Sequence, residues 1–294
     1  MSIPAGATCY LCHFNKHVET ALTLGDEATA TAFAQELMQI YLNASEGTSA
    51  PVFTPLVGNL YQKYYGLDPD RFKEEKEASN RFALERMDTV RERIDAAADR
   101  LYAGLQFALL GNYIDFSALH KQVSFEKLDT LLEEAQNLQV EKASFDALKA
   151  DLAAGKKLLY LTDNAGEICF DRIFAEEIAR AYPQLEITFC VRGGPSQNDA
   201  TRLDAELAGI PFPIIDNGNL VAGTELSQLS DVAKQALDTA DVIISKGQGN
   251  VETLYGCGYN IYYAFLVKCV HFQKLFHKPQ LTPMLLREKG ETFL

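Results

Sequence analysis

The chain has 294 residues, of which 47% are hydrophobic, enough for a substantial core in one large domain or two ordinary ones. Its 40 acidic and 27 basic residues give a formal net charge of -13, which would repel a phosphate backbone and so excludes nucleic acid as a partner. The N-terminus lacks the pattern of a secretory signal, and no stretch is apolar for long enough to span a bilayer, so we expect a cytoplasmic protein with no membrane partner.

The first half of the chain has the apolar spacing of helices. From about residue 8 to 150, apolar side chains recur every three or four positions, with few runs of β-branched residues. Typical stripes are Phe33, Leu37, Ile40 and Tyr41, and then Val90, Ile94, Ala97 and Leu101. We therefore predict an all-helical N-terminal domain over residues 1–154.

A C-x-x-C-H sequence lies near the N-terminus, formed by Cys9, Cys12 and His13. Its spacing is that of covalent haem attachment or of half a zinc site, and His17 follows His13 by one helical turn. Haem attachment of this kind needs export, and a zinc site needs a second close pair of cysteines, which the sequence lacks. We favour a packed helix face, and the role of the two cysteines stays open.

The segment LLGNYIDF, residues 109–116, interrupts a helical pattern with Gly111 and Asn112 and then supplies Asp115. On these residues alone the segment indicates the C-terminal end of a helix, with Gly111 or Asn112 in a left-handed conformation.

After Gly155 the pattern changes to short apolar runs, each followed by a polar turn and a helical segment. The predicted strands are Leu158–Thr162, Ile187–Val191, Pro213–Ile215, Val242–Ser245 and Ile261–Val267. Between them lie predicted helices around Ile168–Tyr182, Asp199–Ala208, Leu226–Ala240 and Asn250–Gly256. This alternation is typical of a parallel sheet covered on both faces, so we predict an α/β domain over residues 155–294.

Polar turns follow these strands, and open α/β sheets bind ligands beyond the carboxyl ends of their strands. Asp163 and Asn164 end the first strand, and Asp199 follows the second. Oxygen ligands from neighbouring strand ends can meet on one divalent cation. Two carboxylates and one amide suit Mg²⁺ or Mn²⁺ better than zinc, which prefers histidine or thiolate.

Each of these residues also has a simpler explanation. Asn198 or Asp199 could cap a helix that starts near residue 199, and Glu167 could stabilise the positive end of its helix. Because the polar residues occur together at adjacent strand ends, we favour a binding site.

The turn SKGQGN, residues 245–250, follows a strand and opens a helix. Gly247 and Gly249 let backbone amides approach a ligand, Lys246 adds a charge, and the helix N-terminus adds a partial positive charge. This arrangement would cradle a phosphate, although a solvent-facing lysine in a glycine turn is about as common. It is not a Walker loop, which has more residues between its glycines and a Lys followed by Ser or Thr.

Together these motifs resemble the damage-control phosphatases once called domain of unknown function 89. The resemblance follows the chain in order through Asn112 and Asp115, Asp163-Asn164-Ala165-Gly166-Glu167, Asn198-Asp199 and Lys246-Gly247-Gln248-Gly249-Asn250. The N-terminal Cys9-x-x-Cys12 resembles the prokaryotic branch of that family. The resemblance implies a helical N-terminal domain and a three-layer, Rossmann-like α/β/α domain with a mostly parallel sheet.

The resemblance also implies a metal-dependent phosphatase that acts on small phosphorylated metabolites, such as sugar phosphates or damaged phospho-metabolites. The metal, which we expect to be Mn²⁺, Mg²⁺, Co²⁺ or Ni²⁺, would be held by the residues that match the family's ligands, Asp163, Asn164 and Asp199. The substrate would be contacted by Lys246, Gly247, Gly249 and Asn250, and from the helical side by Asn112 and Asp115. No oligomeric state is predicted.

Our mechanistic hypothesis is that the cation polarises a phosphoryl oxygen and activates a water that attacks phosphorus in line. Glu167 or Asp115 would orient this water, and direct attack by Asp163 is less favoured because a carboxylate that binds a cation is a poorer nucleophile. Two alternatives are a non-catalytic protein that binds sugar phosphates or nucleotides, and a carboxyl methyltransferase that uses S-adenosylmethionine. The usual glycine-rich loop for that cofactor is missing after the first strand.

Overall fold

The computed structural model describes residues 2–114 and 125–288. The helices before the sheet are α1 (Ala7–Leu24), α2 (Glu27–Leu42), α3 (Phe53–Tyr65), α4 (Lys73–Leu84), α5 (Met87–Ala96), α6 (Arg100–Gly111), α8 (Phe125–Glu133) and α9 (Lys142–Ala154), with short 3-10 helices η1 (Ala50–Val52) and η2 (Ala135–Asn137). No helix within these ranges is both long enough and apolar enough to cross a bilayer.

Strands and helices then alternate, which confirms the predicted α/β fold. The elements are β1 (Lys157–Leu161), α10 (Glu167–Ala181), β2 (Glu186–Val191), α11 (Arg202–Leu207), β3 (Ile214–Asp216), η3 (Leu226–Gln228), α12 (Asp231–Thr239), β4 (Val242–Lys246), α13 (Gln248–Leu254), β5 (Ile261–Leu266), α14 (Val270–Phe276) and β6 (Pro283–Arg287). Helix α14 and strand β6 were not predicted from the sequence. The β6 strand is short, begins with proline and lies at the edge of the sheet, where a missing N–H is tolerated.

The six strands form one sheet in the order β3-β2-β1-β4-β5-β6, and only β6 is antiparallel to its neighbour. Leu161, the last residue of β1, is paired with Cys190 of β2 and Ser245 of β4. The chain adds β2 and β3 on one side of β1 and β4 on the other, so the strand order switches direction between β1 and β4. Ligands bind at such switch points in open α/β sheets.

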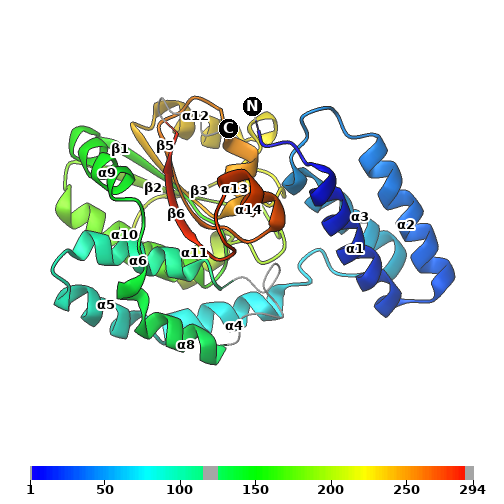
Figure 1. Cartoon of the computed structure of the whole chain (residues 1–294), viewed down its shortest axis with the longest axis horizontal. Coiled ribbons are helices and arrows are strands. Elements are labelled where there is room, and N and C mark those ends of the chain that lie inside the picture. Colours follow the sequence, from blue (N-terminus) through cyan, green and yellow to red (C-terminus); the bar gives the residue numbers. More distant parts are fainter. Residues whose placement is uncertain (1, 115–124, 289–294) are drawn as a thin grey trace.

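Helices cover both faces of the sheet (Figure 1), and its inner strands β1, β2, β4 and β5 are almost fully buried, whereas the edge strands β3 and β6 are partly buried. One face packs against α6, α9 and α10 through a core that includes Leu105, Phe145 and Phe174. The other face packs against α12, α13 and α14 through Leu237, Leu254 and Phe272. This three-layer arrangement agrees with the continuous apolar runs of the strands.

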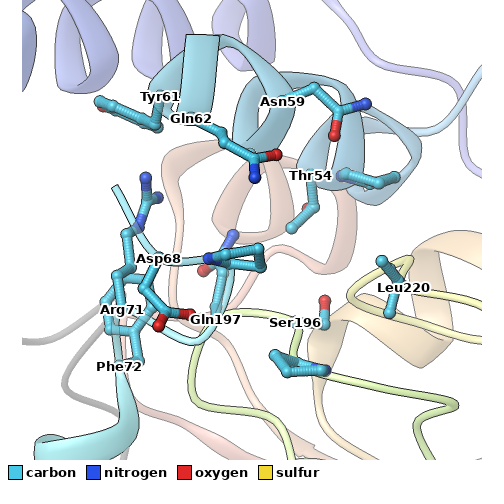
Figure 2. A pocket seen from close by; sticks show the side chains of 14 residues that line it. Thr54, Asn59, Tyr61, Gln62, Asp68, Arg71, Phe72, Ser196, Gln197 and Leu220 are labelled. Atoms are coloured by element: carbon cyan, nitrogen blue, oxygen red, sulfur yellow. The ribbon is translucent and has the colours of Figure 1, made fainter. Parts of the chain in front are cut away.

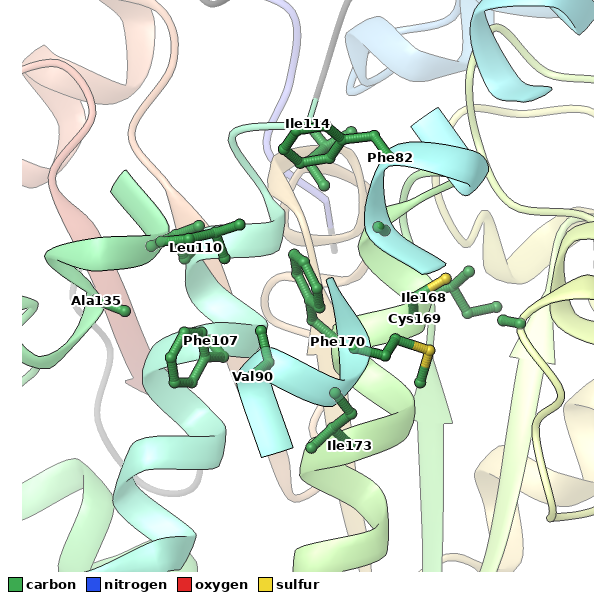
Figure 3. Packing of buried hydrophobic residues seen from close by; sticks show 14 of the residues in the cluster. Phe82, Val90, Phe107, Leu110, Ile114, Ala135, Ile168, Cys169, Phe170 and Ile173 are labelled. Atoms are coloured by element: carbon green, nitrogen blue, oxygen red, sulfur yellow. The ribbon is translucent and has the colours of Figure 1, made fainter. Parts of the chain in front are cut away.

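A further group of helices, α4, α5 and α8, packs on the outside of α6 and α10 (Figure 1). Figure 3 shows this core, in which Phe107 and Leu110 of α6 lie near Phe170 and Ile173 of α10, with Val90 of α5 beside them. The helices before the sheet therefore belong in large part to the packing of the α/β body.

Helices α1 to α3 form a separate cluster to one side of the sheet (Figure 1), with its own core around Phe33, Leu37 and Leu60. The predicted domain boundary at residue 154 coincides with the start of the sheet and stays a prediction. Hydrophobic packing divides the chain differently, because α4 to α9 share their cores with α10 and the strands, while α1 to α3 do not.

His13 and His17 pack inside the α1–α3 cluster, with their ring centroids 4.3 Å apart. The Nδ1 atom of His13 lies 2.5 Å from the Tyr41 hydroxyl, and that of His17 lies 3.0 Å from the Tyr61 hydroxyl. The two histidines thus form a packed helix face, as the sequence favours.

Lowering the pH from 7 to 5 is expected to destabilise the protein through these histidines. Burial lowers the pKa of His13 to about 4 and that of His17 to about 2. The unfolded chain therefore binds more protons below the ordinary histidine pKa, so stability is lost as the pH falls through that value. For His17 alone the loss is about 2 kcal/mol between pH 7 and pH 5.

Urea unfolding at the two pH values would measure this loss. His17→Gln should reduce the pH dependence, whereas the exposed His277, changed to Gln, should leave it unaltered. An unchanged pH dependence in His17→Gln would contradict the assignment to this cluster.

Candidate metal and phosphate site

The loops after β1 and β2 are joined by backbone hydrogen bonds. Asn164 and Asp199 form an isolated antiparallel bridge, and Ala200 N donates to Asp163 O at 2.7 Å. Ala165 N donates to the carbonyl of the residue before Asp199, at 2.9 Å. These bonds bring together the three residues that the sequence proposes as metal ligands.

The three side chains are buried, with 7%, 2% and 5% of Asp163, Asn164 and Asp199 exposed. Asn164 Nδ2 donates to Asp163 Oδ2 at 2.8 Å. Arg192, itself 2% exposed, donates from Nε to Asp199 Oδ2 at 2.5 Å, and its Nη2 lies 3.8 Å from Asp163 Oδ1. The site is therefore a compact polar cluster in which Arg192 bridges the two aspartates.

Helix α11 has a different cap from the one suggested by the sequence. It begins at Arg202, and Thr201 is its N-cap, forming a capping box with Asp204. The simpler explanation of Asn198 or Asp199 as the cap of this helix is therefore wrong.

Glu167 is the first residue of α10 and is fully buried. Its Oε2 accepts a hydrogen bond from Asn164 Nδ2 at 2.7 Å, and its Oε1 accepts one from Lys246 Nζ at 2.6 Å. Asn112 Nδ2 lies within 3.1 Å of both oxygens. The role of Glu167 in orienting water stays a prediction, and the alternative residue, Asp115, lies outside the described residues.

Asn112 ends α6 with a right-handed backbone, at φ -69°, and Gly111 lies within the helix. The predicted end of the helix is confirmed, whereas the predicted left-handed conformation is wrong. Asn112 points into the site instead, where Nδ2 donates to Asp163 Oδ2 at 3.0 Å and Oδ1 accepts from Leu266 N at 3.2 Å. A Cβ on Gly111 would lie 3.1 Å from Glu167 Cγ, so glycine here allows α6 to approach α10. The predicted substrate contact of Asn112 stays a prediction.

Lys246 ends β4 and is fully buried. Its ammonium group donates to Glu167 Oε1 and Asp171 Oδ1, both at 2.6 Å, and to Ala108 O at 2.8 Å. An ammonium group has three donors, and all three are used here. The predicted phosphate contact of Lys246 therefore requires the exchange of one of these partners.

Gly247 packs directly against Asp163. It has φ +77°, and a Cβ at this position would lie 2.0 Å from Asp163 Cγ, so no other residue fits. Its amide donates to Ala264 O at 3.1 Å, within the sheet. Glycine at position 247 is therefore required for close packing against Asp163.

Gly249 and Asn250 lie in the first turn of α13. A Cβ on Gly249 would lie 2.1 Å from Ala222 O. Asn250 Nδ2 donates to Thr162 O at 3.0 Å and to Lys246 O at 2.7 Å, so this side chain connects the ends of β1 and β4. The predicted substrate contacts of Gly247, Gly249 and Asn250 stay predictions.

Burial and nearby like charges together determine the electrostatics around Asp163. Burial, followed by the nearby charges of Glu167 and Asp199, raises the pKa of Asp163 well above its ordinary value. Lys268 and Arg192 act in the opposite direction. The nearby positive charges of Lys268 and Arg192 therefore compensate the negative charge of the site only in part.

Two cations near the site, Arg192 and Lys268, were not predicted from the sequence. Both follow an apolar strand directly or nearly so, Arg192 after β2 and Lys268 after β5, and both are less than 9% exposed. A buried cation at a strand end is the signal that could have identified them, because the same reasoning selected the polar turn residues.

The donors at this site fit a hard divalent cation. Within residues 2–114 and 125–288, no three side chains among His, Cys, Asp and Glu form a metal-binding group, so the third ligand would be the Asn164 amide. Its Oδ1 accepts from Asn198 Nδ2 at 2.7 Å while its Nδ2 faces Asp163, so binding a cation requires the amide to turn over. Two carboxylates and one amide oxygen then match the oxygen preference of Mg²⁺ and Mn²⁺.

Residues 6–281 match the family model described as the damage-control phosphatase ARMT1-like domain. An uncharacterized protein of Methanocaldococcus jannaschii is 32% identical over 279 residues, which cover 91% of this chain and 90% of that protein. A damage-control phosphatase of Archaeoglobus fulgidus is 31% identical over 246 residues, covering 81% of this chain and 82% of the relative.

A damage-control phosphatase of Pyrococcus horikoshii is 32% identical over 233 residues, covering 77% of each chain. The crystal structure of a DUF89 family protein from the same organism superimposes with a TM-score of 0.83 at 26% identity, over 98% of this chain and all of the other. The sequence similarity and the structural similarity to these proteins thus both extend along nearly the whole chain.

Proposed function

Since the chain belongs to the damage-control phosphatase family, with an ARMT1-like domain, we propose that it is a divalent-cation-dependent phosphatase that hydrolyses small phosphorylated metabolites. The observation that carries the proposal is the convergence of Asp163, Asn164 and Asp199 from two neighbouring strand ends, beside the switch point of the sheet. Two relatives of similar length have the name damage-control phosphatase, which supports the reaction class.

Asp163, Asn164 and Asp199 would hold the cation. When bound, it would supply positive charge to stabilise phosphoryl oxygens and to acidify a water molecule. Arg192 keeps Asp199 in place through its 2.5 Å hydrogen bond, so this carboxylate needs little reorganisation on binding.

The substrate phosphate would lie beyond the carboxyl ends of the strands, where it would face the positively charged side chains of the site. Lys268, whose charge lowers the pKa of Asp163, is a candidate phosphate contact together with Lys246 and Gly249. Glu167 is fixed by Asn112, Asn164 and Lys246, and it or Asp115 would orient the attacking water.

Phosphate release from a generic aryl phosphate tests the proposal. We expect activity with Mg²⁺, Mn²⁺, Co²⁺ or Ni²⁺, loss of activity in excess chelator, and recovery when the cation is restored. Activity that persists in chelator would contradict the proposed cation dependence. Thermal stabilisation by phosphorylated metabolites without any turnover would show a binding protein instead of an enzyme.

A further inference from the structure

A small hollow of about 60 Å³ lies between α3, residues 68–72 and the loop that carries Asp199 (Figure 2). Its lining combines apolar residues with polar side chains, which include Gln62 from α3, Arg71 from the segment that follows, and Ser196 and Gln197 from the loop. The hollow joins the α1–α3 cluster to the α/β body, and none of its residues belongs to the proposed cation site.

Ser196 lines this hollow and carries a buried hydroxyl. The residue is 2% exposed, and within the described chain its Oγ has no hydrogen-bond partner. A buried hydroxyl without a hydrogen-bond partner destabilises the folded state by about 1–3 kcal/mol. A polar ligand atom that forms a hydrogen bond with this hydroxyl would recover part of that free energy. Figure 2 shows Ser196 beside Gln197 at the lower side of the hollow.

Arg71 offers a guanidinium group. Its Cζ lies 4.0 Å from the ring centroid of Tyr61 and 5.1 Å from that of Phe72, so two rings fix its orientation. Among the described residues it forms no ion pair, although the Asp68 carboxylate also lines the hollow. A stacked arginine without a carboxylate partner is suited to bind an anion through its planar donors.

The hollow is close to the proposed cation site along the chain. Asp199 N donates to Ser196 O at 3.0 Å, so the two residues share one tight turn. Even fully extended, three residues span at most about 11 Å, so one small metabolite can reach from Asp199 to Ser196.

We propose that this hollow binds a carboxylate of the substrate, with Arg71 and Ser196 as its donors. The protein would then act on phosphate monoesters of hydroxy acids, and this inference rests on the proposed phosphatase function. The Asp68 carboxylate in the lining disfavours the double negative charge of a second phosphate more than the single charge of a carboxylate. The amides of Gln62 and Gln197 would bind neighbouring hydroxyl groups.

Two matched pairs of compounds test the inference, because the members of each pair differ only in carboxylate against hydroxymethyl. They are 3-phosphoglycerate with glycerol 3-phosphate, and 6-phosphogluconate with sorbitol 6-phosphate. The full-length protein should prefer the carboxylate member of at least one pair by about tenfold or more in kcat/KM, as expected for a charge-assisted hydrogen bond.

Arg71→Met keeps the apolar stem on Tyr61 but removes the donors, so this preference should fall to near unity. Arg71→Lys should retain part of it, and Ser196→Ala should weaken it. Lys234→Met, which removes an equal charge from an exposed position on α12, is the matched control and should leave the preference unchanged. Circular dichroism would show that each variant is folded.

Equal kcat/KM values for the two members of each pair would overturn the inference. A preference for the carboxylate member that survives Arg71→Met would overturn it as well. A preference for fructose 1,6-bisphosphate over both carboxylates would assign the hollow to phosphate and overturn it too. Calorimetry with the same compounds separates the two proposals. Binding of 6-phosphogluconate that depends on Arg71, without turnover, would support the subsite and reject the phosphatase.

Discussion

Asp163→Asn is expected to abolish phosphatase activity and, in the cation-free protein, to raise the melting temperature. Activity should fall at least about a hundredfold, because even outer partners of metal ligands change activity by 10- to 100-fold. Stability should rise because Asp163 is buried beside the charges of Glu167 and Asp199. An asparagine can still accept the bonds from Asn112 and Asn164 through its Oδ1.

The pKa of Asp163 gives the sign of the stability change. Because that pKa is raised in the folded state, the folded protein binds more protons than the unfolded chain above the ordinary aspartate pKa. Stability is therefore lost as the pH rises through the folded value, and neutralising the residue removes this loss. The melting temperature of the variant should then depend less on pH.

Thermal unfolding in chelator, together with the aryl phosphate assay, would measure both effects. Asp88→Asn is a suitable control, because that side chain is 97% exposed and should affect neither property. A variant that is inactive but less stable than the wild type would contradict the like-charge interpretation of the site.

Lys246→Met is expected to destabilise the protein by about 3–5 kcal/mol, the usual effect of removing one partner from a buried ion pair. Burial lowers the pKa of Lys246. The negative charges and hydrogen bonds of Asp171 and Glu167 together have the larger effect, so the pKa of the ammonium group is raised. Without the lysine, two carboxylates and the Ala108 carbonyl would lose a donor in a fully buried position.

Urea unfolding at pH 7 would measure the loss, and Lys234→Met supplies an exposed control. Burial raises the pKa of Asp171 to about 7, although Lys246 opposes this rise. Asp171→Asn in the Lys246→Met background should therefore recover part of the stability, because a neutral amide replaces one of the two buried carboxyl groups that lost their cation. No recovery in the double variant would contradict the assigned role of Asp171.

The strand ends were the predictable part of the site. An apolar run followed by Asp163 and Asn164 marks the end of a parallel strand, and the carboxyl ends of parallel strands share one edge of the sheet. Periodicity therefore placed Asp199 near Asp163, and the structure brings them together.

The partners of each residue were less predictable, because they come from distant parts of the chain. Lys246 contacts Ala108, which is 138 positions away, and no local pattern indicates this contact. The glycine turn suggested an open phosphate cradle, whereas Gly247 is needed to accommodate the Asp163 side chain. The edge strand β6 was also missed, since it is short and begins with proline.

The packing of α6 against α10 determines where the chain of this protein can be truncated. A fragment that begins at residue 155 would expose the surface of α10 that Phe107 and Leu110 normally cover. It would also lack Asn112 and Ala108, which hold Glu167 and Lys246 in place. Truncation at the start of the sheet therefore removes the helices that pack on α10 and hold the site residues in place. Shortened versions of the protein would have to retain α4 to α9.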